Sequence, residues 1–590
     1  MHRCLLLPDI LQRILDILLI LPRADFYGGY QQFQDKNPSL ARLARTCRRF
    51  LEPCLDVLWR HQRTLAPLVR TLPADVYEET LYQEPLKPLA PRFCAITLIR
   101  PLVQSDWSRF DYYAPRIKAL GSFHNEFADE EGTSWHMSSD YPCERLADRL
   151  TVSQLAFYRR GRWLLPNLVR LRWNVWDLWY NDHMPLFFSP SLRSLAFGFW
   201  PGAIPPHDAY ACAVQYCIAP ILEGLDLLCP SLTDLEMYAV HPVHIVEAAA
   251  NFALEAAELE GYVVNSTAHF PCHPSFLVHL AARPRLRKLF LHVEFPFVED
   301  IAYYFADAGI FHPFPSLQNL YLKAPRIELC IAILESMPEC RLFSLTVEID
   351  NRPLAVDVAR LFKTIHARCA KSTLHACRTI GYASGEGDEA VDRYYPDYAV
   401  DMSILRPMLQ FPNMRAFRFG LPLLGWLHDE DLQAVGEAWP GLVTFAFLDH
   451  YKTPCLTPAT WKGVAALICR APILTSLRVH FDTKAIIITG PADVPGLRPN
   501  QQLRFLDISN SVLIDDPMAF AQSLFTIAPR VVSVSAVGWT SLGMEPMHCD
   551  PRTFCEEVDK VMCLLRAEKF GIEYLWDRLG RTELAGEYLR

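Results

Sequence analysis

The chain has 590 residues, 51% of them hydrophobic and 21% charged, and its formal net charge at pH 7 is -9. This length is too great for one compact core, so we expect several domains or a repeat array, and the composition is that of a globular protein. The negative charge argues against a nucleic-acid-binding protein, which needs a clustered basic face. No stretch approaches the roughly twenty apolar residues of a membrane span.

The cysteines and the N-terminal stretch indicate an intracellular protein. The 18 cysteines are spread along the chain, and no Cys-x-x-Cys occurs. They are more typical of buried, reduced thiols than of a disulfide framework. The apolar run that ends at Leu21 is short and follows Asp9, Arg13 and Asp16, which is unlike a signal peptide. We therefore expect a cytoplasmic or nuclear location.

The first sixty residues predict three helices. Apolar residues recur at helical spacing in a first helix, in a second that follows Ser39, a candidate N-cap, and in a third, short one from near Pro53. Three short helices cannot cover so much apolar surface among themselves, so part of it should belong to a partner. The apolar positions are Leu7, Ile10, Leu11, Ile14, Leu15 and Leu18, then Leu40, Leu43, Ala44, Cys47 and Phe50, then Leu55, Leu58 and Trp59.

Three short sequences in this region, Leu7 to Leu11, Leu43 to Phe50 and Glu52 to Trp59, occur in the order of an F-box of the fungal type. The resemblance covers about a tenth of the chain. It implies that the helices dock a Skp-family adaptor and, through it, a cullin. An ordinary helical cap on a larger domain is the alternative. The residues expected to contact the adaptor, or to hold the contacting surface, are Leu7, Pro8, Ile10, Leu11, Ile14, Leu40, Leu43, Cys47, Leu58 and Trp59.

A short pattern recurs through the rest of the chain: a proline, one residue, then apolar-x-x-apolar-x-apolar. Examples are Pro315 with Leu317, Leu320 and Leu322, and Pro440 with Leu442, Phe445 and Phe447, while copies at Leu342 and Leu503 lack the proline. The last two apolar positions are two residues apart, which is the period of a strand. The proline ends the helix that precedes this strand. Helices are expected between the strands, for example at Ile327–Met337, Val356–Cys369 and Trp461–Cys469.

A strand and a helix in every 25 to 30 or so residues resemble a degenerate leucine-rich repeat that lacks the regular asparagine at the strand end. The expected fold class is therefore α/β, with parallel strands on a concave face and helices on a convex face. A non-repeating α/β domain is the alternative. The expected domains are an F-box-like module (1–62), a helical linker (63–87), a solenoid (88–545) and a C-terminal helical cap (546–590).

Irregular gaps between copies of the pattern predict insertions near 121–150, 238–283 and 380–400. The first contains an acidic stretch, 124–132, that is typical of a solvated loop. The second contains a predicted helix, Val246–Gly261. The third is rich in Gly, Asp and Tyr. Long loops of this kind are either disordered or functional.

Residues with evident chemistry are scarce. His269, Cys272 and His273, with His241 and His244, match no standard zinc spacing. The Gly-rich stretch 384–388 has no following Lys and is a poor phosphate cradle, and no Gly-x-Ser-x-Gly is present. We therefore expect no catalytic site, no metal and no cofactor. The aromatic residues Trp173, Trp176, Trp179, Tyr180, Phe187 and Phe188 are more typical of packing than of a recognition surface.

Together, the two parts resemble an F-box protein with leucine-rich repeats. The resemblance implies a substrate receptor of a cullin-RING ubiquitin ligase, with an unidentified target protein on the repeats and catalysis by proximity alone. A non-catalytic interaction scaffold without a ligase role is one alternative. An enzyme or ligand-binding protein on an α/β body is another, but it needs a convergent polar pocket.

Overall fold

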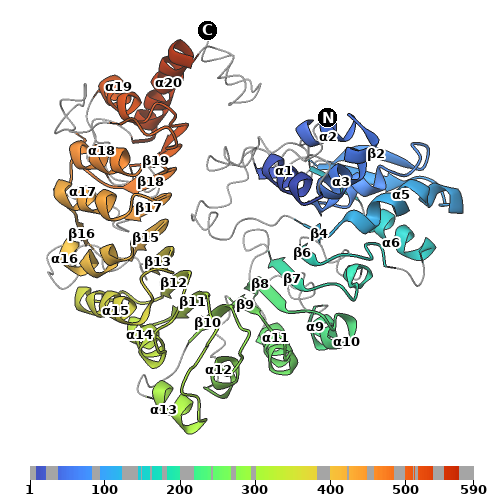
Figure 1. Ribbon diagram of the computed structural model, residues 1–590, viewed down its shortest axis with the longest axis horizontal. Helices are drawn as coiled ribbons and strands as arrows, with labels where there is room; N and C mark the ends of the chain where they lie inside the picture. The colour runs from blue at the N-terminus through green and yellow to red at the C-terminus, as the bar shows by residue number, and fades with distance from the viewer. Residues whose placement is uncertain are drawn as a thin grey trace. The chain divides into compact units, whose positions relative to one another are not determined.

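The computed structural model describes residues 8–20, 38–82, 93–121, 144–147, 149–159, 163–175, 183–199, 218–240, 243–266, 274–293, 300–381, 399–421, 424–447, 458–483, 498–508, 511, 516–535 and 551–570. The chain forms two compact units, Met1–Phe270 and Pro271–Arg590. Figure 1 shows both as strands with helices.

Unit 1 begins with three helices and continues as alternating strands and helices. Its main elements are α1 (Pro8–Ile20), α2 (Pro38–Ala44), α3 (Arg48–Trp59), β1 (His61–Gln62), α4 (Ala66–Val69), β2 (Tyr77–Tyr82), β3 (Phe93–Leu98), α5 (Trp107–Tyr113), η4 (Ala114–Arg116), β4 (Ala119–Leu120), β5 (Glu144–Ala147), α6 (Arg149–Tyr158), β6 (Arg170–Val175), β7 (Ser194–Phe199), α9 (Ala219–Glu223), α10 (Leu225–Leu228), β8 (Asp234–Val240), α11 (Val243–Glu255) and β9 (Gly261–Ser266).

Unit 2 repeats one strand and one helix more regularly. Its main elements are α12 (Pro274–Ala281), β10 (Lys288–His292), α13 (Asp300–Asp307), β11 (Asn319–Ala324), α14 (Ile327–Ser336), β12 (Ser344–Ile349), α15 (Ala355–Arg368), β13 (Ala376–Gly381), β14 (Ala399–Asp401), α16 (Met402–Leu405), β15 (Ala416–Gly420), β16 (Leu424–Trp426), α17 (Asp429–Ala438), β17 (Thr444–Phe447), α18 (Trp461–Arg470), β18 (Ser476–Val479), β19 (Phe505–Asp507), α19 (Pro517–Ile527), β20 (Ser533–Ser535) and α20 (Pro551–Phe570).

Each unit arranges its strands in parallel, in nearly the order of the sequence. In unit 1 the order is β1-β4-β6-β7-β8-β9, and in unit 2 it is β10-β11-β12-β13-β15-β17-β18-β19-β20. Within unit 2 the helices line one side of the strand series (Figure 1). Parallel neighbours need a crossover connection, which the helix of each repeat provides. The predicted α/β repeat solenoid is therefore confirmed.

The apolar positions of the recurring pattern form the core because the strands pair in register. Leu320 of β11 pairs with Leu345 of β12, and two residues later Leu322 pairs with Val347. All four side chains are at most 2% exposed. Alternate residues on a strand point to opposite faces, so these pairs face the helices and the residues between them face away. The predicted helices of α14, α15 and α18 are confirmed to within one residue at each end.

Aromatic residues strengthen the middle of unit 2. Phe417 of β15 stacks on Phe445 of β17, with ring centroids 6.0 Å apart. Phe419 stacks on Phe447 at 4.9 Å. Trp439, which follows α17, packs on Phe417 at 5.1 Å. The four phenylalanine rings occupy the strand positions at which other repeats carry Leu or Val, so the same strand spacing encloses a larger apolar volume.

The prediction of an insertion at 238–283 is wrong for most of its length. That segment contains the end of β8, then α11, β9 and α12, which make an ordinary repeat. The pattern was missed because it is degenerate: no proline precedes Leu259, and Tyr262 replaces the usual aliphatic residue that pairs with Leu235. The predicted helix Val246–Gly261 ends earlier, at Glu255, and Gly261 already begins β9.

The structure corrects two further expectations for the region where the repeats begin. The copy of the pattern at Pro91 forms β3, which pairs antiparallel with β2 and parallel with β5 in a separate three-stranded sheet. The segment 63–87 is only partly helical, since it contains the short α4 and the strand β2. Most of the other two predicted insertions, 122–143 and 382–398, lies outside the described residues.

The predicted C-terminal cap contains α20, which closes the strand series of unit 2. Phe554 is fully buried, and its ring lies 5.8 Å from that of Phe520 in α19. Arg566 is 3% exposed and donates a hydrogen bond to the carbonyl of Val531 at 2.8 Å. Asp559 accepts one from the backbone N–H of Val534, in the last strand, at 2.9 Å. Side chains of α20 therefore pair backbone groups that an edge strand would leave open.

Candidate functional site

The three N-terminal helices pack around a small core of their own. Leu15, Leu40 and Cys54 are fully buried there, with Leu11 and Phe50 nearly so. The remaining buried members of this cluster are Ala44 and Val57. The predicted three-helix module is therefore present, with one small apolar core.

The second and third helices divide at a different point from the one expected. The sequence indicated a second helix through Phe50 and a third from Pro53, but α2 ends at Ala44 and α3 runs unbroken from Arg48 to Trp59 with Pro53 inside it. The break is a turn in which Thr46 donates its backbone N–H and its hydroxyl to the carbonyl of Leu43. Phe50 consequently belongs to α3.

The predicted adaptor-binding residues differ in how far the structure exposes them. Leu11 and Leu40 are buried in the module, so they can hold a surface but cannot form one. Ile10 is 39% exposed, and Leu51 of α3, which the sequence analysis passed over, is 36% exposed. Four predicted residues, Ile14, Leu43, Cys47 and Leu58, are half-buried. Leu7 and the side chain of Pro8 lie outside the described residues.

Trp59, one of the residues predicted to contact the adaptor or to hold that surface, also joins the module to the repeats. Its ring stacks on Tyr113 of α5, with centroids 4.3 Å apart and planes 23° apart. One residue later, Arg60 leads directly into β1, which pairs with β4. The three helices thus continue into the first strand of unit 1 without a flexible linker.

Charged residues strengthen the same junction. Arg116, whose side chain is only 12% exposed, forms ion pairs with Glu52 and Asp56 of α3. Tyr112 donates a hydrogen bond to Glu52 at 2.5 Å, and its ring lies 4.6 Å beneath the Arg116 guanidinium. The hydrogen bond from Tyr112, followed by the one from Arg116, lowers the pKa of Glu52. The carboxylate is therefore ionised at neutral pH, as the ion pair requires.

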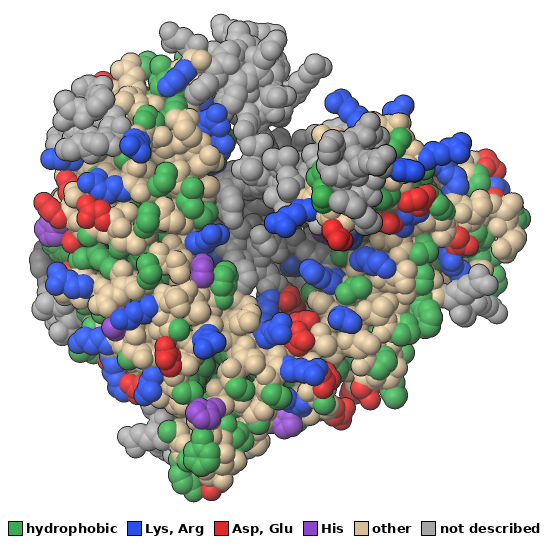
Figure 2. Space-filling view, viewed as in Figure 1, with side chains coloured by type: hydrophobic (Ala, Val, Ile, Leu, Met, Phe, Trp, Pro, Cys, Tyr) green, Lys and Arg blue, Asp and Glu red, His purple; other side chains and the backbone are tan. Residues whose placement is uncertain are grey.

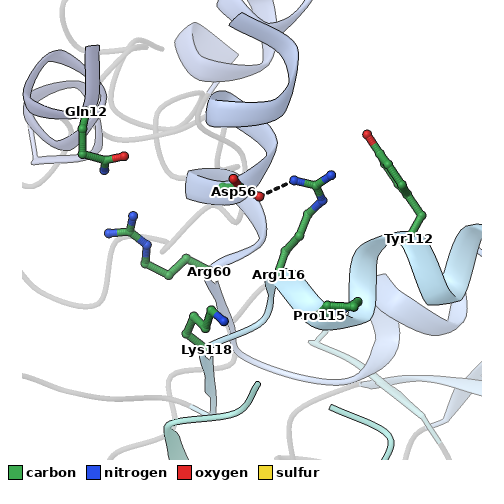
Figure 3. A pocket seen from close by; sticks show the side chains of 7 residues that line it. All are labelled: Gln12, Asp56, Arg60, Tyr112, Pro115, Arg116 and Lys118. Carbon is green, nitrogen blue, oxygen red and sulfur yellow. Dashed lines mark hydrogen bonds and ion pairs between the residues drawn. The ribbon is translucent and has the colours of Figure 1, made fainter. Parts of the chain in front are cut away.

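An open pocket of about 490 Å³ lies at this junction. Arg60, Arg116 and Lys118 line it, together with Asp56. Gln12 enters from α1, and Tyr112 and Pro115 complete the wall (Figure 3). We call it the junction pocket. The sequence analysis missed it because its residues are far apart in the chain and none belongs to a motif.

The strand face opposite the helices of unit 2 is the other candidate surface. Arg378, Arg418, Ala446 and Arg478 occupy one in-register row across four strands. Arg478 forms an ion pair with Asp507 at 2.9 Å. In β11 and β12, Lys323 forms one with Glu348 at 2.7 Å. This face therefore carries charged side chains beside some apolar ones, such as Ala446, whereas the face toward the helices is apolar.

The described residues contain no group of three or more His, Cys, Asp or Glu side chains arranged to hold a metal ion. His269, Cys272 and His273 lie outside them. Of the aromatic group, Trp173 and Phe187 pack together at 5.5 Å and are nearly buried, as is Phe188. Trp176, Trp179 and Tyr180 are not described. Within the described part of the chain, no helix combines the length and apolarity needed to cross a bilayer.

Neither a known protein family nor a curated protein matches the chain. Among solved structures, it is similar to a chain of the Rad7 and Elc1 complex in yeast, at 13% identity and a TM-score of 0.35, over 65% of this chain and 80% of that one. It is also similar to a leucine-rich-repeat protein of Leptospira interrogans, at 14% identity and a TM-score of 0.26, over 63% and 79%. These likenesses are remote, so the fold assignment rests on the strand register described above.

Proposed function

We propose that this chain is the substrate receptor of a cullin-RING ubiquitin ligase. The N-terminal helices bind a Skp-family adaptor, and the repeats hold a target protein, in the cytoplasm or nucleus. The receptor itself makes and breaks no bonds. It raises the effective concentration of a target lysine near the conjugating enzyme.

The observation that carries this proposal is the three-helix module itself. It has an independent core and leaves Ile10 and Leu51 exposed, on helices whose sequence resembles an F-box. Two exposed apolar residues are a small surface, so the proposal depends mainly on the three-helix core and on the order of the F-box-like sequences. The junction through Trp59 and Arg116 also supports the proposal, since it holds the module against the first repeats of unit 1.

The strand face of unit 2 is the surface that we assign to the target. Its residues are polar and lie in register, so neighbouring strands present side chains at intervals of about 4.8 Å. Arg378 of β13 is only 7% exposed, so it supports this face from beneath, whereas its neighbour Arg418 on β15 is half-buried.

Co-purification with a Skp-family adaptor tests the proposal. The residue to substitute is chosen by the solvent exposure of its side chain. Leu11→Asp would place a charge in the module core and unfold it, so its effect on binding would be uninformative. Ile10→Asp alters a residue that is already 39% exposed. Ile473→Asp, at 42% exposure in unit 2, is the matched control.

We expect wild-type chain and Ile473→Asp to co-purify with the adaptor in equal amounts, and Ile10→Asp to bind at least about tenfold more weakly, as for a central apolar contact. Circular dichroism should be the same for all three. If the wild-type chain purifies without the adaptor, the module is only a helical cap and the proposal fails.

A reconstituted ubiquitin-ligation reaction distinguishes the proposed substrate receptor from the alternative, a non-catalytic scaffold. The adaptor complex is mixed with a cullin-RING core, a charged conjugating enzyme and a protein captured on the repeats. Ubiquitin transfer that is lost with Ile10→Asp supports the receptor. Stable capture of both proteins without transfer would instead favour the non-catalytic scaffold.

A further inference from the structure

We propose that Cys340 and Cys369 form a redox modification site, at which hydrogen peroxide converts two thiols into a reversible disulfide between neighbouring repeats of unit 2. This inference is independent of the proposed receptor function, because it depends only on the geometry of the two residues. Cys340 lies in the turn between α14 and β12, and Cys369 directly follows α15. Both are free thiols, and their sulfur atoms are 3.6 Å apart.

Backbone pairing holds the two cysteines directly opposite each other. They form an isolated parallel bridge. The N–H of Cys340 donates to the carbonyl of Arg368 at 2.7 Å, and the N–H of Ala370 donates to the carbonyl of Cys340 at 2.9 Å. Paired segments lie about 4.8 Å apart, and disulfides join residues whose Cα atoms are about 4.4 to 6.8 Å apart. Rotation of the side chains can therefore bring the sulfurs to bonding distance while the backbone stays in place.

One thiol of the pair is activated by the other. A hydrogen bond from the Cys369 thiol lowers the pKa of Cys340, and the same hydrogen bond raises the pKa of Cys369. The thiolate is the form that reacts with peroxide. By contrast, Cys330 and Cys377 are fully buried, and burial raises the pKa of both thiols. Cys340 is also more exposed than Cys369, at 8% against 3%, so we assign the first step to Cys340.

The reaction consumes one peroxide for each disulfide. The thiolate of Cys340 attacks one peroxide oxygen, the O–O bond breaks, and a sulfenic acid and a hydroxide ion form. The thiolate of Cys369 then attacks the sulfenic sulfur, the S–O bond breaks, and an S–S bond and a second hydroxide form. The two protons lost by the thiols convert both hydroxides to water. Each sulfur has lost one electron and the peroxide has gained two, and a small thiol reverses the oxidation by exchange.

The disulfide would add a covalent tie between two repeats that already contact one another. Charged side chains of both signs lie over α14 and α15 (Figure 2), and Arg360 of α15 pairs with Glu335 of α14 at 3.0 Å. These side chains are 56% and 41% exposed, so their ion pair contributes little. Cys340 and Cys369 are 29 residues apart, and their bond closes a loop that contains β12 and α15. Closing a loop restricts the unfolded states of that segment, so oxidation stabilises these repeats.

Non-reducing peptide mapping tests the proposal. The full chain is treated with hydrogen peroxide, its free thiols are alkylated as it is unfolded, and it is digested with trypsin. Cleavage after arginine and lysine places Cys340 in peptide 327–341 and Cys369 in peptide 369–371. We expect the two peptides to be separate before peroxide, joined after it, and separate again after dithiothreitol. Amide hydrogen exchange between the two cysteines should slow in the oxidised chain and recover with dithiothreitol.

Alanine substitutions identify the linked sulfurs. Cys340→Ala and Cys369→Ala should each abolish the joined peptide. Cys330→Ala removes the other cysteine of peptide 327–341, so it is the matched control and should leave the joined peptide in place. Thermal melting of the reduced variants verifies that each is folded, and fragmentation of the joined wild-type peptide locates the bond without any variant. No joined peptide after peroxide, or a bond from Cys369 to Cys377 instead, would overturn the proposal.

Discussion

The two ends of the chain attach to their strands in opposite ways. At the N-terminal end, α3 leads into β1, and a half-exposed ring stack and ion pairs to exposed carboxylates hold the helices. At the C-terminal end, α20 inserts Phe554 into the core and pairs backbone groups of the last strand through Asp559 and Arg566. The first junction is held by half-exposed contacts, whereas the second is held by a buried ring and by hydrogen bonds to backbone groups.

This difference indicates that the N-terminal helices and α20 have different structural roles. A cap that only ends a repeat array needs to cover apolar area and satisfy edge hydrogen bonds, as α20 does. The N-terminal helices have a separate core instead, and their contacts with the rest of unit 1 are half-exposed. The comparison therefore predicts that substitutions at the C-terminal end cost more stability than those at the N-terminal end.

The largest effect is expected for Phe554→Ala. This fully buried ring contacts Phe520, and its removal leaves a cavity, so we expect a loss of about 3 to 5 kcal/mol in the local stability of the cap. Hydrogen exchange of the amides in α20 measures it. Leu564→Ala, at a residue that is 54% exposed on the same helix, should cost little. Equal effects of the two would show that α20 is not packed as described.

The second prediction concerns pH. Burial raises the pKa of Asp559 to about 7, although the N–H of Val534 and the charge of Arg566 partly oppose the shift. The unfolded carboxyl has a pKa of about 3.9, so between about pH 4 and pH 7 the folded chain keeps a proton that the unfolded chain has lost. The bound proton therefore stabilises the folded chain fully below about pH 4, and this stabilisation is lost as the pH rises through about 7.

We therefore expect the wild-type cap to lose about 2 kcal/mol of stability between about pH 5 and pH 8, relative to Asp559→Asn. The asparagine keeps an oxygen for the Val534 N–H but does not titrate in this range. Hydrogen exchange of both proteins at the two pH values gives the difference. Parallel pH profiles would contradict the raised pKa of this half-buried carboxyl.

At the N-terminal junction, Trp59→Leu should have a smaller effect. The substitution keeps an apolar side chain and removes the stack on Tyr113, which is worth about 1 kcal/mol. Hydrogen exchange of the amides in α3 reports the local loss. A cost as large as that of Phe554→Ala would remove the contrast between the two ends.

The smallest effect is expected for Arg116→Gln. Its partners Glu52 and Asp56 are more than half exposed, and such ion pairs contribute at most about 1 kcal/mol. The difference from wild type should shrink further at high salt, because counter-ions screen the pairs. A loss that does not depend on salt would mean that Arg116 acts through packing instead.

The repeats could be predicted from sequence where their pattern was apolar and regular. Strands such as β11 and β12 place Leu at both inward positions, and their alternation is visible in the sequence. In β13 the same two positions are Cys377 and Thr379. They are buried all the same, because the neighbouring strands dictate the register. Tertiary pairing there overrides a weak local signal.

Polar contacts between distant segments could not be predicted. Asn500 is 2% exposed, and its amide donates to the carbonyls of Ala471 and Leu474 while its oxygen accepts from the N–H of Leu503. A single asparagine carries no periodic signal. The junction pocket is similar, since pairing of β1 with β4 places Lys118 beside Arg60. The candidate docking residues were found by helical spacing, but spacing alone could not separate exposed Ile10 from buried Leu11.

Only Arg60 separates the end of α3 from the start of β1. This short connection limits how far α3 can move relative to the strand. A long flexible tether would let a bound partner sample many positions and would lower its effective concentration at each. A single residue between a helix and a paired strand permits almost no such sampling. The distance between a partner bound to α3 and a partner bound on the first strands of unit 1 is then set by the fold itself.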